Sequence, residues 1–137
     1  MGEWGVLLAG EVVLVRELVR ADVPVEPGVY LWRRDGAVVY VGTAISLRGR
    51  LWSKHLGRGV SLAGSSLRRN VCELLFGIPP RVTSNPDREK VTREQSDAIR
   101  AWLSECELSW RICDTSTDAK DLETRLLSTY MPPLNRI

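Results

Sequence analysis

The chain has 137 residues, of which 44% are hydrophobic and 26% are charged, a composition typical of a single soluble domain. No apolar run approaches the roughly 20 residues that a membrane-spanning helix needs, and Glu3 and Glu11 interrupt the N-terminal segment that a secretory signal would keep apolar. We therefore expect one cytoplasmic domain over residues 1–137, with no membrane contact.

The sulfur and imidazole ligands of the chain are few. Cys72, Cys106 and Cys113 have no Cys-x-x-Cys spacing, and His55 is the only histidine. This set is too poor for a structural zinc site and does not form a disulfide framework. We expect reduced, buried cysteines, and nothing in the pattern supports a Cys/His nucleophile pair.

Positive charge is concentrated in the middle of the chain. The net charge is only +2, but residues 31–70 carry eight basic groups and one acid, a local +7, whereas residues 1–30 sum to −3 and residues 71–137 to −2. A basic segment inside a near-neutral protein fits a contact face for a phosphate backbone. A solvated surface with scattered arginines is the alternative.

The first half of the chain predicts a helix, a hairpin and a second helix. Residues 11–21 repeat apolar side chains at helical spacing, and two prolines follow that segment. Strands are expected at 28–34 and 37–42, because an Asp-Gly pair separates two runs rich in Val and Tyr. Ser46 is the expected N-cap of a helix over residues 47–57.

After a glycine-rich loop, the middle of the chain predicts another helix with Ser65 or Ser66 as its N-cap. Its apolar stripe follows i, i+4, i+7 and i+8 spacing. The stripe comprises Leu67, Val71, Leu74 and Leu75. Residues 77–91 are expected to form a surface loop, and loops of this length are often functional.

The last third predicts a helix, a strand and a final helix. Thr92 and Gln95 have the spacing of a capping box and begin the first of these helices. Apolar and polar residues alternate over 107–113, which predicts a strand. Thr117 is the expected N-cap of a last helix that runs to about Thr129.

One glutamate on the last predicted helix falls among apolar residues. At 100° per residue, Glu123 lies in the middle of the apolar side, where an unpaired carboxylate costs several kcal/mol. Two interpretations stay open: a buried salt bridge to an arginine, or a ligand of a divalent metal, since one carboxylate with water and phosphate oxygens suits Mg²⁺. Asn135, twelve residues later, either returns to the same site or is a simple tail residue.

Taken together, these residues resemble the GIY-YIG endonuclease family. Residues 28–30, Gly-Val-Tyr, resemble the first triplet of the family, and residues 40–42, Tyr-Val-Gly, the second. Arg50 follows the second tyrosine by ten residues, as the arginine of the family does. Glu123 on a later helix and the closing Pro-Leu-Asn at 133–135 complete five matches in order. The motifs cover about 27–57 and 117–136.

The resemblance implies an α/β (α+β) fold with a small, mainly antiparallel three-stranded sheet flanked by helices, and an active site on one sheet face. The hairpin and the strand near 107–113 are compatible with that fold. The chain would be a single GIY-YIG-like domain over 1–137, with an N-terminal extension at 1–26 and a helical insertion at 58–106.

The resemblance also implies a divalent-metal-dependent endonuclease that hydrolyses phosphodiester bonds in DNA by water attack at a single-metal site, with Mg²⁺ or Mn²⁺. Tyr30 would activate the water, Tyr40 would hold water or phosphate, Arg50 would stabilise charge on the phosphate, Glu123 would hold the metal and Asn135 would orient the site. Because a free tyrosine titrates near about pH 10, Tyr30 would need nearby positive charge to lower its pKa.

The chain departs from the family pattern after the arginine. The family commonly has His or Tyr four residues later, where this chain has Lys54, with His55 one residue further on. On a regular helix Lys54 lies about 40° from Arg50 and His55 about 140°. Either Lys54 takes the polar role as a phosphate contact, or a local irregularity of the helix brings His55 into the site.

Seven basic residues are candidates for contacts with the nucleic-acid backbone, which confer salt-sensitive affinity and little sequence information. They are Arg33, Arg34, Arg48, Lys54, Arg58, Arg68 and Arg69. DNA is the expected substrate, RNA is left open, and no separate domain indicates whether a partner protein or a homodimer directs the chain. A catalytically silent nucleic-acid-binding module and a purely structural or partner-binding domain are the alternative functions.

Overall fold

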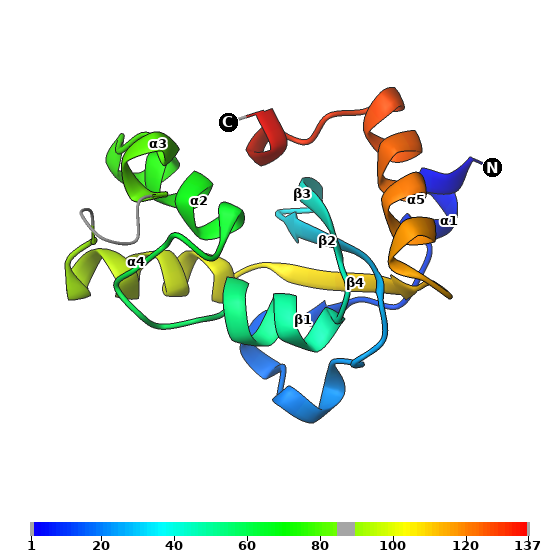
Figure 1. The fold of residues 1–137 in the computed structure, drawn as a ribbon, viewed down its shortest axis with the longest axis horizontal. Helices are drawn as coiled ribbons and strands as arrows, with labels where there is room; N and C mark the ends of the chain where they lie inside the picture. The colour runs from blue at the N-terminus through cyan, green and yellow to red at the C-terminus, as the bar shows by residue number, and fades with distance from the viewer. Residues whose placement is uncertain (1, 85–89, 137) are drawn as a thin grey trace.

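The computed structural model describes residues 2–84 and 90–136 and contains a four-stranded antiparallel sheet flanked by helices (Figure 1). The strand order is β1-β4-β2-β3. The strands are β1 (Val13–Leu14), β2 (Gly28–Arg34), β3 (Ala37–Ala44) and β4 (Glu107–Ile112). The structure confirms the mixed fold and the three predicted strands. It adds β1, a two-residue strand that pairs with β4.

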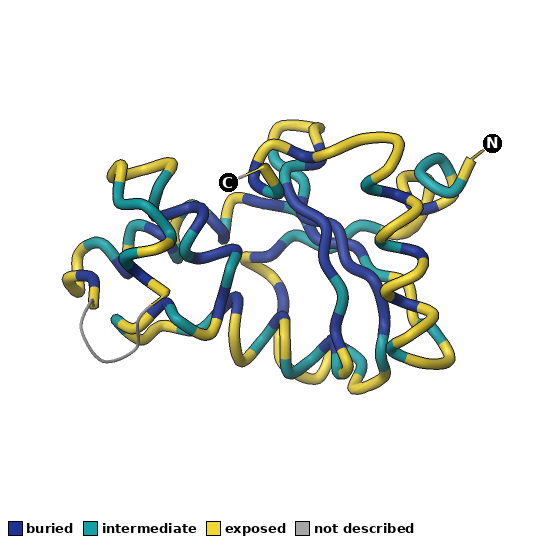
Figure 2. The backbone as a smooth tube through the Cα atoms, turned by 45° about the horizontal axis from the view of Figure 1, so that its top comes forward, coloured by how far each residue is buried: buried dark blue, intermediate teal, exposed yellow. Residues whose placement is uncertain are grey.

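An Asp-Gly turn joins β2 to β3. Asp35 and Gly36 have φ angles of 52° and 80°, and positive φ at both central residues is what a type I′ hairpin turn requires. The register places Tyr30 opposite Gly42. The predicted hairpin is therefore confirmed, and its two strands are buried along most of their length (Figure 2).

The predicted helix over residues 11–21 is wrong. That segment contains β1 and the short 3-10 turns η1 (Val15–Glu17) and η2 (Arg20–Asp22), while a helix, α1 (Glu3–Leu8), precedes it. Its valines favour extended backbone, and the unpaired edge of β4 gives that backbone a hydrogen-bonding partner.

One face of the sheet is covered by η3 (Gly49–His55), α2 (Ser66–Phe76) and α4 (Arg93–Ser104); Tyr30 and Tyr40 pack in the core on this face, which we call the η3 face. Two predicted caps on this side are confirmed. The Ser65 hydroxyl accepts the Arg68 N–H at the start of α2, and Thr92 and Gln95 form a capping box at the start of α4.

Helix α2 extends beyond the core, so only part of its predicted apolar stripe is buried. Leu67 and Val71 are buried, but Leu74 and Leu75 in its last turn are 54% and 39% exposed. The predicted loop over 77–91 contains a short helix, α3 (Pro80–Thr83), and its residues 85–89 lie outside the described residues.

The opposite face of the sheet, which we call the α5 face, is covered by α5 (Ser116–Thr129). The N-cap of α5 is Thr115, whose hydroxyl accepts the Asp118 N–H at 3.0 Å, rather than the predicted Thr117. The buried residues of this face form a separate core from that of the η3 face. They are Leu7, Val29, Leu31, Val41, Ala119, Leu122 and Leu126.

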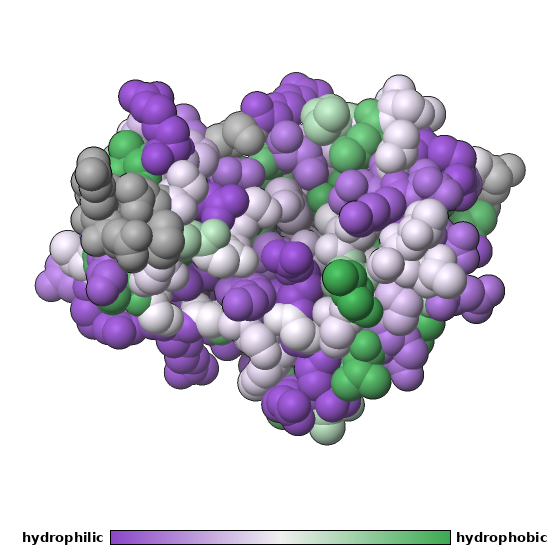
Figure 3. Space-filling view, in the orientation of Figure 1, coloured by the Kyte–Doolittle hydropathy of each residue, from purple (hydrophilic) through white to green (hydrophobic). Residues whose placement is uncertain are grey.

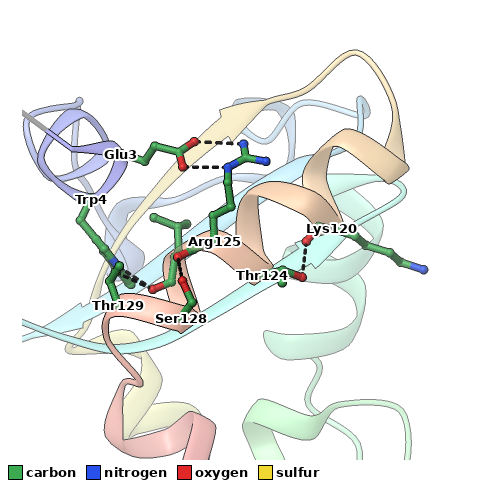
Figure 4. A network of polar contacts seen from close by, with 8 residues as sticks. Glu3, Trp4, Lys120, Thr124, Arg125, Ser128 and Thr129 are labelled. Carbon is green, nitrogen blue, oxygen red and sulfur yellow. Dashed lines mark hydrogen bonds and ion pairs between the residues drawn. The ribbon is translucent and has the colours of Figure 1, made fainter.

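Helix α1 is fastened to α5 at the outer side of this core (Figures 1 and 4). The Arg125 guanidinium donates two hydrogen bonds, of 2.8 and 3.0 Å, to the Glu3 carboxylate, and the Trp4 indole N–H donates to the Leu126 carbonyl at 2.7 Å. No helix of residues 2–84 and 90–136 has the length and apolar character that crossing a membrane requires.

Candidate active site

Tyr30 and Tyr40 lie next to each other on the η3 face. Their ring centroids are 6.4 Å apart, with an angle of 31° between the ring planes. Both side chains are buried, and the residue opposite Tyr30 is Gly42. A Cβ atom at Gly42 would overlap the Tyr30 hydroxyl, so the glycine of the second triplet provides the space that this phenol occupies.

The helix that follows the hairpin has an irregular turn that reaches His55. Ser46 caps its start by accepting the Gly49 N–H at 3.3 Å. The segment Gly49–His55 is π-helical, and the Leu56 N–H donates to the Leu51 carbonyl five residues back, at 2.9 Å. A π-helical turn holds more residues than an α-helical one, so His55, five residues after Arg50, returns to the same side of the helix.

His55 links the hairpin to the start of α2 through two hydrogen bonds. Its Nε2 lies 2.6 Å from the Tyr30 hydroxyl oxygen, and its Nδ1 lies 2.6 Å from the Ser65 hydroxyl oxygen. The imidazole is fully buried, with the Trp32 ring edge-on at 6.3 Å. Of the two alternatives left by the sequence, the structure therefore brings His55 to Tyr30.

The environment of His55 keeps the imidazole neutral. Burial, together with the nearby positive charges of Arg50, Arg69 and Arg68, lowers the pKa of His55 to about 3, and burial has the largest effect. A neutral imidazole has one N–H donor and one acceptor nitrogen. When Nδ1–H donates to Ser65, Nε2 accepts the Tyr30 proton, and the three groups form a directed chain.

The low pKa of His55 predicts loss of stability in mild acid. His55 binds a proton near about pH 6.5 in the unfolded chain and only near pH 3 in the folded chain. The contribution of neutral His55 to the free energy of unfolding is therefore complete above pH 6.5 and declines as pH falls toward 3. We expect the free energy of unfolding in urea to drop by about 1 kcal/mol per pH unit between 6 and 5. His55→Gln should remove this slope, because the chain has no other histidine; an equal slope in both proteins would contradict the assignment.

Tyr40 is held by the residue beside Ser65. Its hydroxyl lies 2.7 Å from the Ser66 hydroxyl, in the first turn of α2. The two adjacent serines thus reach both phenols, Ser66 directly and Ser65 through His55. Sequence reasoning identified these serines only as alternative N-caps. The sequence did contain a signal: an N-cap needs only one hydroxyl, so the second of two adjacent serines is free for another contact.

Burial sets the protonation of both phenols. The pKa of Tyr30 is raised well above its usual value, first by burial, with Tyr40 and Glu123 acting in the same direction and Arg50 opposing them. Burial likewise raises the pKa of Tyr40. The expected lowering of the Tyr30 pKa is therefore not supplied by the protein groups, since burial outweighs Arg50.

Arg50 and Glu123 approach the phenols from different elements. Arg50 is exposed on η3, and its positive charge lowers the pKa of Tyr30, Tyr40 and His55. Glu123 lies on α5, and its negative charge raises the pKa of both phenols. Both charged groups are thus within electrostatic reach of the tyrosine pair.

Glu123 is half-buried, which corrects its predicted place in the centre of the apolar side. The buried stripe of α5 runs through Ala119, Leu122 and Leu126, and Glu123 lies at its border. Desolvation raises the pKa of its carboxyl, and Lys120 opposes the rise. The carboxylate forms no ion pair with any described residue, so the buried salt bridge to an arginine is not what the structure shows.

The donor set around the phenols fits a hard divalent cation better than a softer one. Residues 2–84 and 90–136 contain no group of three or more His, Cys, Asp or Glu side chains that could hold a metal. A half-buried carboxylate that forms no ion pair with the described residues suits Mg²⁺, which keeps several of its waters and needs one or two carboxylates. Glu123 is the residue that would hold it.

Asn135 fastens the C-terminal segment to the edge strand of the sheet. Its side-chain oxygen accepts the Val41 N–H and its amide donates to the Val41 carbonyl, both at 2.9 Å. Asn70 on α2 donates to the Leu134 carbonyl at 2.8 Å. The chain thus passes from α5 along the edge of β3 to α2, and Asn135 holds the backbone of the second triplet at its middle residue, Val41.

The predicted nucleic-acid contacts fall into two groups. Five guanidinium groups donate hydrogen bonds to carbonyl oxygens of their own chain. They are Arg33, Arg34, Arg48, Arg68 and Arg69. Lys54 and Arg58 are exposed, and their side chains bond to none of the described residues. The structure therefore gives the hairpin arginines, Arg33 and Arg34, a role in holding α1 and α4.

Comparison with known proteins agrees with this geometry. Residues 22–136 match the family profile of the GIY-YIG catalytic domain. The chain is also similar to UvrABC system protein C of Synechococcus sp. (strain JA-3-3Ab), with 26% identity over 115 residues. That match covers 83% of this chain but only 13% of the relative. Because the family match extends over most of its length, the chain belongs to the GIY-YIG catalytic domain family, a family of nucleases.

Proposed function

We propose that the chain is a divalent-metal-dependent endonuclease that hydrolyses phosphodiester bonds in DNA, with water as the nucleophile. The observation that carries the proposal is the buried chain from Tyr30 through His55 to Ser65, next to the charges of Arg50 and Glu123. A purely structural domain gives no reason to bury an imidazole and two phenols beside a carboxylate that has no partner among the described residues.

The phenol and the imidazole act together as proton acceptor. As water attacks phosphorus and the bond from phosphorus to the leaving oxygen breaks, one proton of the water passes to the Tyr30 oxygen while the Tyr30 proton passes to Nε2 of His55, so that the phenol ends as it began; the leaving oxygen takes a proton from solvent. His55 is neutral at working pH, and because its pKa is low, transfer of that proton depends on the negative charge of the bound phosphate. The imidazolium is then compensated by the negative charge that develops on the phosphate, and its Nδ1–H donates to Ser65.

Arg50 stabilises charge on the phosphate. Its exposed guanidinium forms no hydrogen bond or ion pair with any of the described residues, so it is available to the substrate. Cationic donors in comparable roles contribute roughly 10²- to 10⁵-fold in rate. Tyr40, oriented by Ser66, positions water or a phosphate oxygen. A cation held by Glu123 would polarise the phosphoryl and leaving oxygens.

Metal removal tests the proposed activity. We expect supercoiled plasmid to be nicked in the presence of Mg²⁺ or Mn²⁺, and nicking to stop in EDTA. The protein groups raise the pKa of Tyr30 rather than lower it, so activation of the water depends on the cation. Gel electrophoresis of the plasmid measures both. Metal-independent nicking, or none with either metal, would contradict the proposal.

The second candidate is a catalytically silent module that binds nucleic acid. Salt-sensitive binding by the wild type, measured by fluorescence anisotropy, with no cutting in either metal would favour it. The tyrosines, His55, Arg50 and Glu123 are all present, and the charges of Arg50 and Glu123 both act on the pKa of Tyr30, which favours the enzyme. Since residues 2–84 and 90–136 form one such site, cutting both strands of a duplex requires two copies or two visits.

A further inference from the structure

Two surface cavities of the described residues have the same volume, about 300 Å³, but differ in charge. The first lies on the α5 face, between α1, the end of β4 and α5. Its wall carries both signs: Arg111 and Arg125 face Glu3, Asp114 and Asp118. The arginines of this cavity are thus compensated by acids of the same wall.

The second cavity lies on the other side of the sheet, between η3 and the start of α2, and has no acid in its wall. Of its nine lining residues, three are basic, three are serines and three are glycines. The basic residues are Lys54, Arg58 and Arg68. Figure 3 shows hydrophilic residues gathered over the centre of the face seen in Figure 1, where η3, α2 and the hairpin meet. Hydroxyls and positive charge without a carboxylate form a wall suited to an anion.

The positive charge behind this wall is built into the fold. Arg68 is buried, and its guanidinium donates to the Gly59 carbonyl at 2.7 Å and the Ser96 hydroxyl at 3.0 Å. These acceptors are neutral. Among the residues that the structure describes, no carboxylate forms an ion pair with Arg68, so its charge is left for another negative group to balance.

Neighbouring arginines reinforce that charge. Burial lowers the pKa of Arg68, and repulsion from Arg93 and Arg100 lowers it further. The pKa of Arg100 is likewise lowered by burial and by Arg58, and the Arg100 Nε is buried without a hydrogen-bond partner in the described part of the chain. Holding like charges together is unfavourable, and a bound anion would offset that cost.

One serine joins this cavity to the candidate active site. Ser65 lines the cavity, and its hydroxyl lies 2.6 Å from Nδ1 of His55, whose other nitrogen contacts Tyr30. The cavity therefore begins immediately behind the residue that supports the proposed proton acceptor. A strand with its scissile phosphate at the phenols has a neighbouring segment beside this cavity.

We propose that the cavity between η3 and α2 binds a second phosphate of the substrate strand, one that flanks the scissile phosphate. Lys54 and Arg58 contact this phosphate, and buried Arg68 supplies fixed positive charge behind them. The proposal rests on the proposed function, because it assumes a nucleic-acid strand at the phenols. It gives the glycine- and serine-rich segment after η3 the role of positioning that strand.

The test compares Arg58→Ala and Lys54→Ala with Arg111→Ala, a matched control in the acid-compensated cavity of equal volume. Binding of a fluorescein-labelled duplex is measured by anisotropy in EDTA over a range of KCl concentrations. We expect Arg58→Ala and Lys54→Ala each to raise Kd about fivefold and to reduce the slope of log Kd against log salt by about 1. Arg111→Ala should bind as the wild type does.

A duplex that carries one uncharged methylphosphonate linkage, moved along the strand, locates the contact. At one position the neutral linkage should weaken the wild type by at least about fivefold and weaken Arg58→Ala by a smaller factor, since that variant has already lost one of the two contacts to this phosphate. Equal Kd values and salt slopes for Arg58→Ala and Arg111→Ala would overturn the proposal. A second result would also overturn it: inorganic phosphate stabilises the wild type but not Arg58→Ala, while both proteins bind the oligonucleotide equally. The cavity would then be a site for free phosphate rather than for the substrate strand.

The binding assay also separates the two proposals. If the wild type cuts no DNA with Mg²⁺ or Mn²⁺ but Arg58→Ala still loses affinity and salt slope, the nuclease activity fails and the phosphate site stands. If the wild type cuts DNA and Arg58→Ala matches Arg111→Ala in affinity, slope and KM, the phosphate site fails and the nuclease activity stands.

Discussion

Replacing Tyr30 by phenylalanine is expected to lower kcat for DNA cleavage by about 10²- to 10⁴-fold, the usual contribution of a positioned acid–base group. The change removes the hydroxyl that lies 2.6 Å from Nε2 of His55 and leaves the ring in place against Gly42. Because Arg50 and the basic cavity keep their charge, Kd for DNA should stay within about twofold. Single-turnover cleavage of a labelled oligonucleotide at saturating Mg²⁺ measures the rate.

Stability must be followed in the same variant, because the deleted hydroxyl is buried. An unpaired His55 Nε2 costs about 1–3 kcal/mol, which urea unfolding detects. Tyr130→Phe is the matched control: Tyr130 is 42% exposed at the end of α5, and its variant should cut at the wild-type rate. A folded Tyr30→Phe that cuts within a few-fold of wild type would refute the role given to this phenol.

Glu123→Gln is expected to reduce metal-dependent cleavage by about 10³-fold or more, since a Lewis acid contributes several kcal/mol and each 1.4 kcal/mol corresponds to about tenfold in rate. Glutamine keeps the size of the side chain and removes the charge that would hold the cation. The rate should recover only in part at high Mg²⁺, which a titration of cleavage against metal concentration would show.

The same substitution should leave the fold intact or stabilise it. Burial raises the pKa of the Glu123 carboxyl, which means that its ionised form is unfavourable in place, and a neutral amide relieves that cost. Lost activity without lost stability is typical of a functional site. Asp121→Asn, on the exposed side of the same helix, is the control. Wild-type cutting by Glu123→Gln would exclude this residue as the metal ligand.

The features that sequence reasoning predicted well depend on local chemistry. The hairpin follows from Asp35 and Gly36, because the turn needs positive φ at both positions and these residues accept it. The caps at Ser65 and Thr92 likewise need only a hydroxyl and the next turn of helix. Such signals are complete within a few residues, but they do not always choose between neighbouring hydroxyls, since α5 is capped by Thr115 rather than the predicted Thr117.

The features that sequence reasoning could not resolve depend on packing between distant elements. A regular helix favours Lys54 over His55, and the π-helical turn that reverses this choice brings His55 to Tyr30 and Ser65, which lie 25 and 10 residues away in the sequence. Residues 11–21 share apolar spacing with a helix but lie beside the open edge of β4. In both cases tertiary contacts outweigh periodicity.

The charges of the site show the same limit. The helical wheel placed Glu123 in the core, whereas the sheet meets α5 along Ala119, Leu122 and Leu126 and leaves Glu123 at the border. The count of basic residues could not distinguish arginines that hold carbonyls, such as Arg34 and Arg48, from Lys54 and Arg58, which face solvent. That difference appears only when donors and acceptors are placed in space.

The most direct measurement is a double-mutant cycle of single-turnover cleavage rates for wild type, Tyr30→Phe, Glu123→Gln and the combined variant, all with Mg²⁺ on one oligonucleotide. If hairpin phenol and α5 carboxylate serve the same hydrolytic step, each single change slows cutting by at least about 10²-fold, and the combined variant is slowed by far less than the product of the two. Wild-type cutting by either folded single variant, or losses that multiply as for independent sites, would contradict a shared active centre.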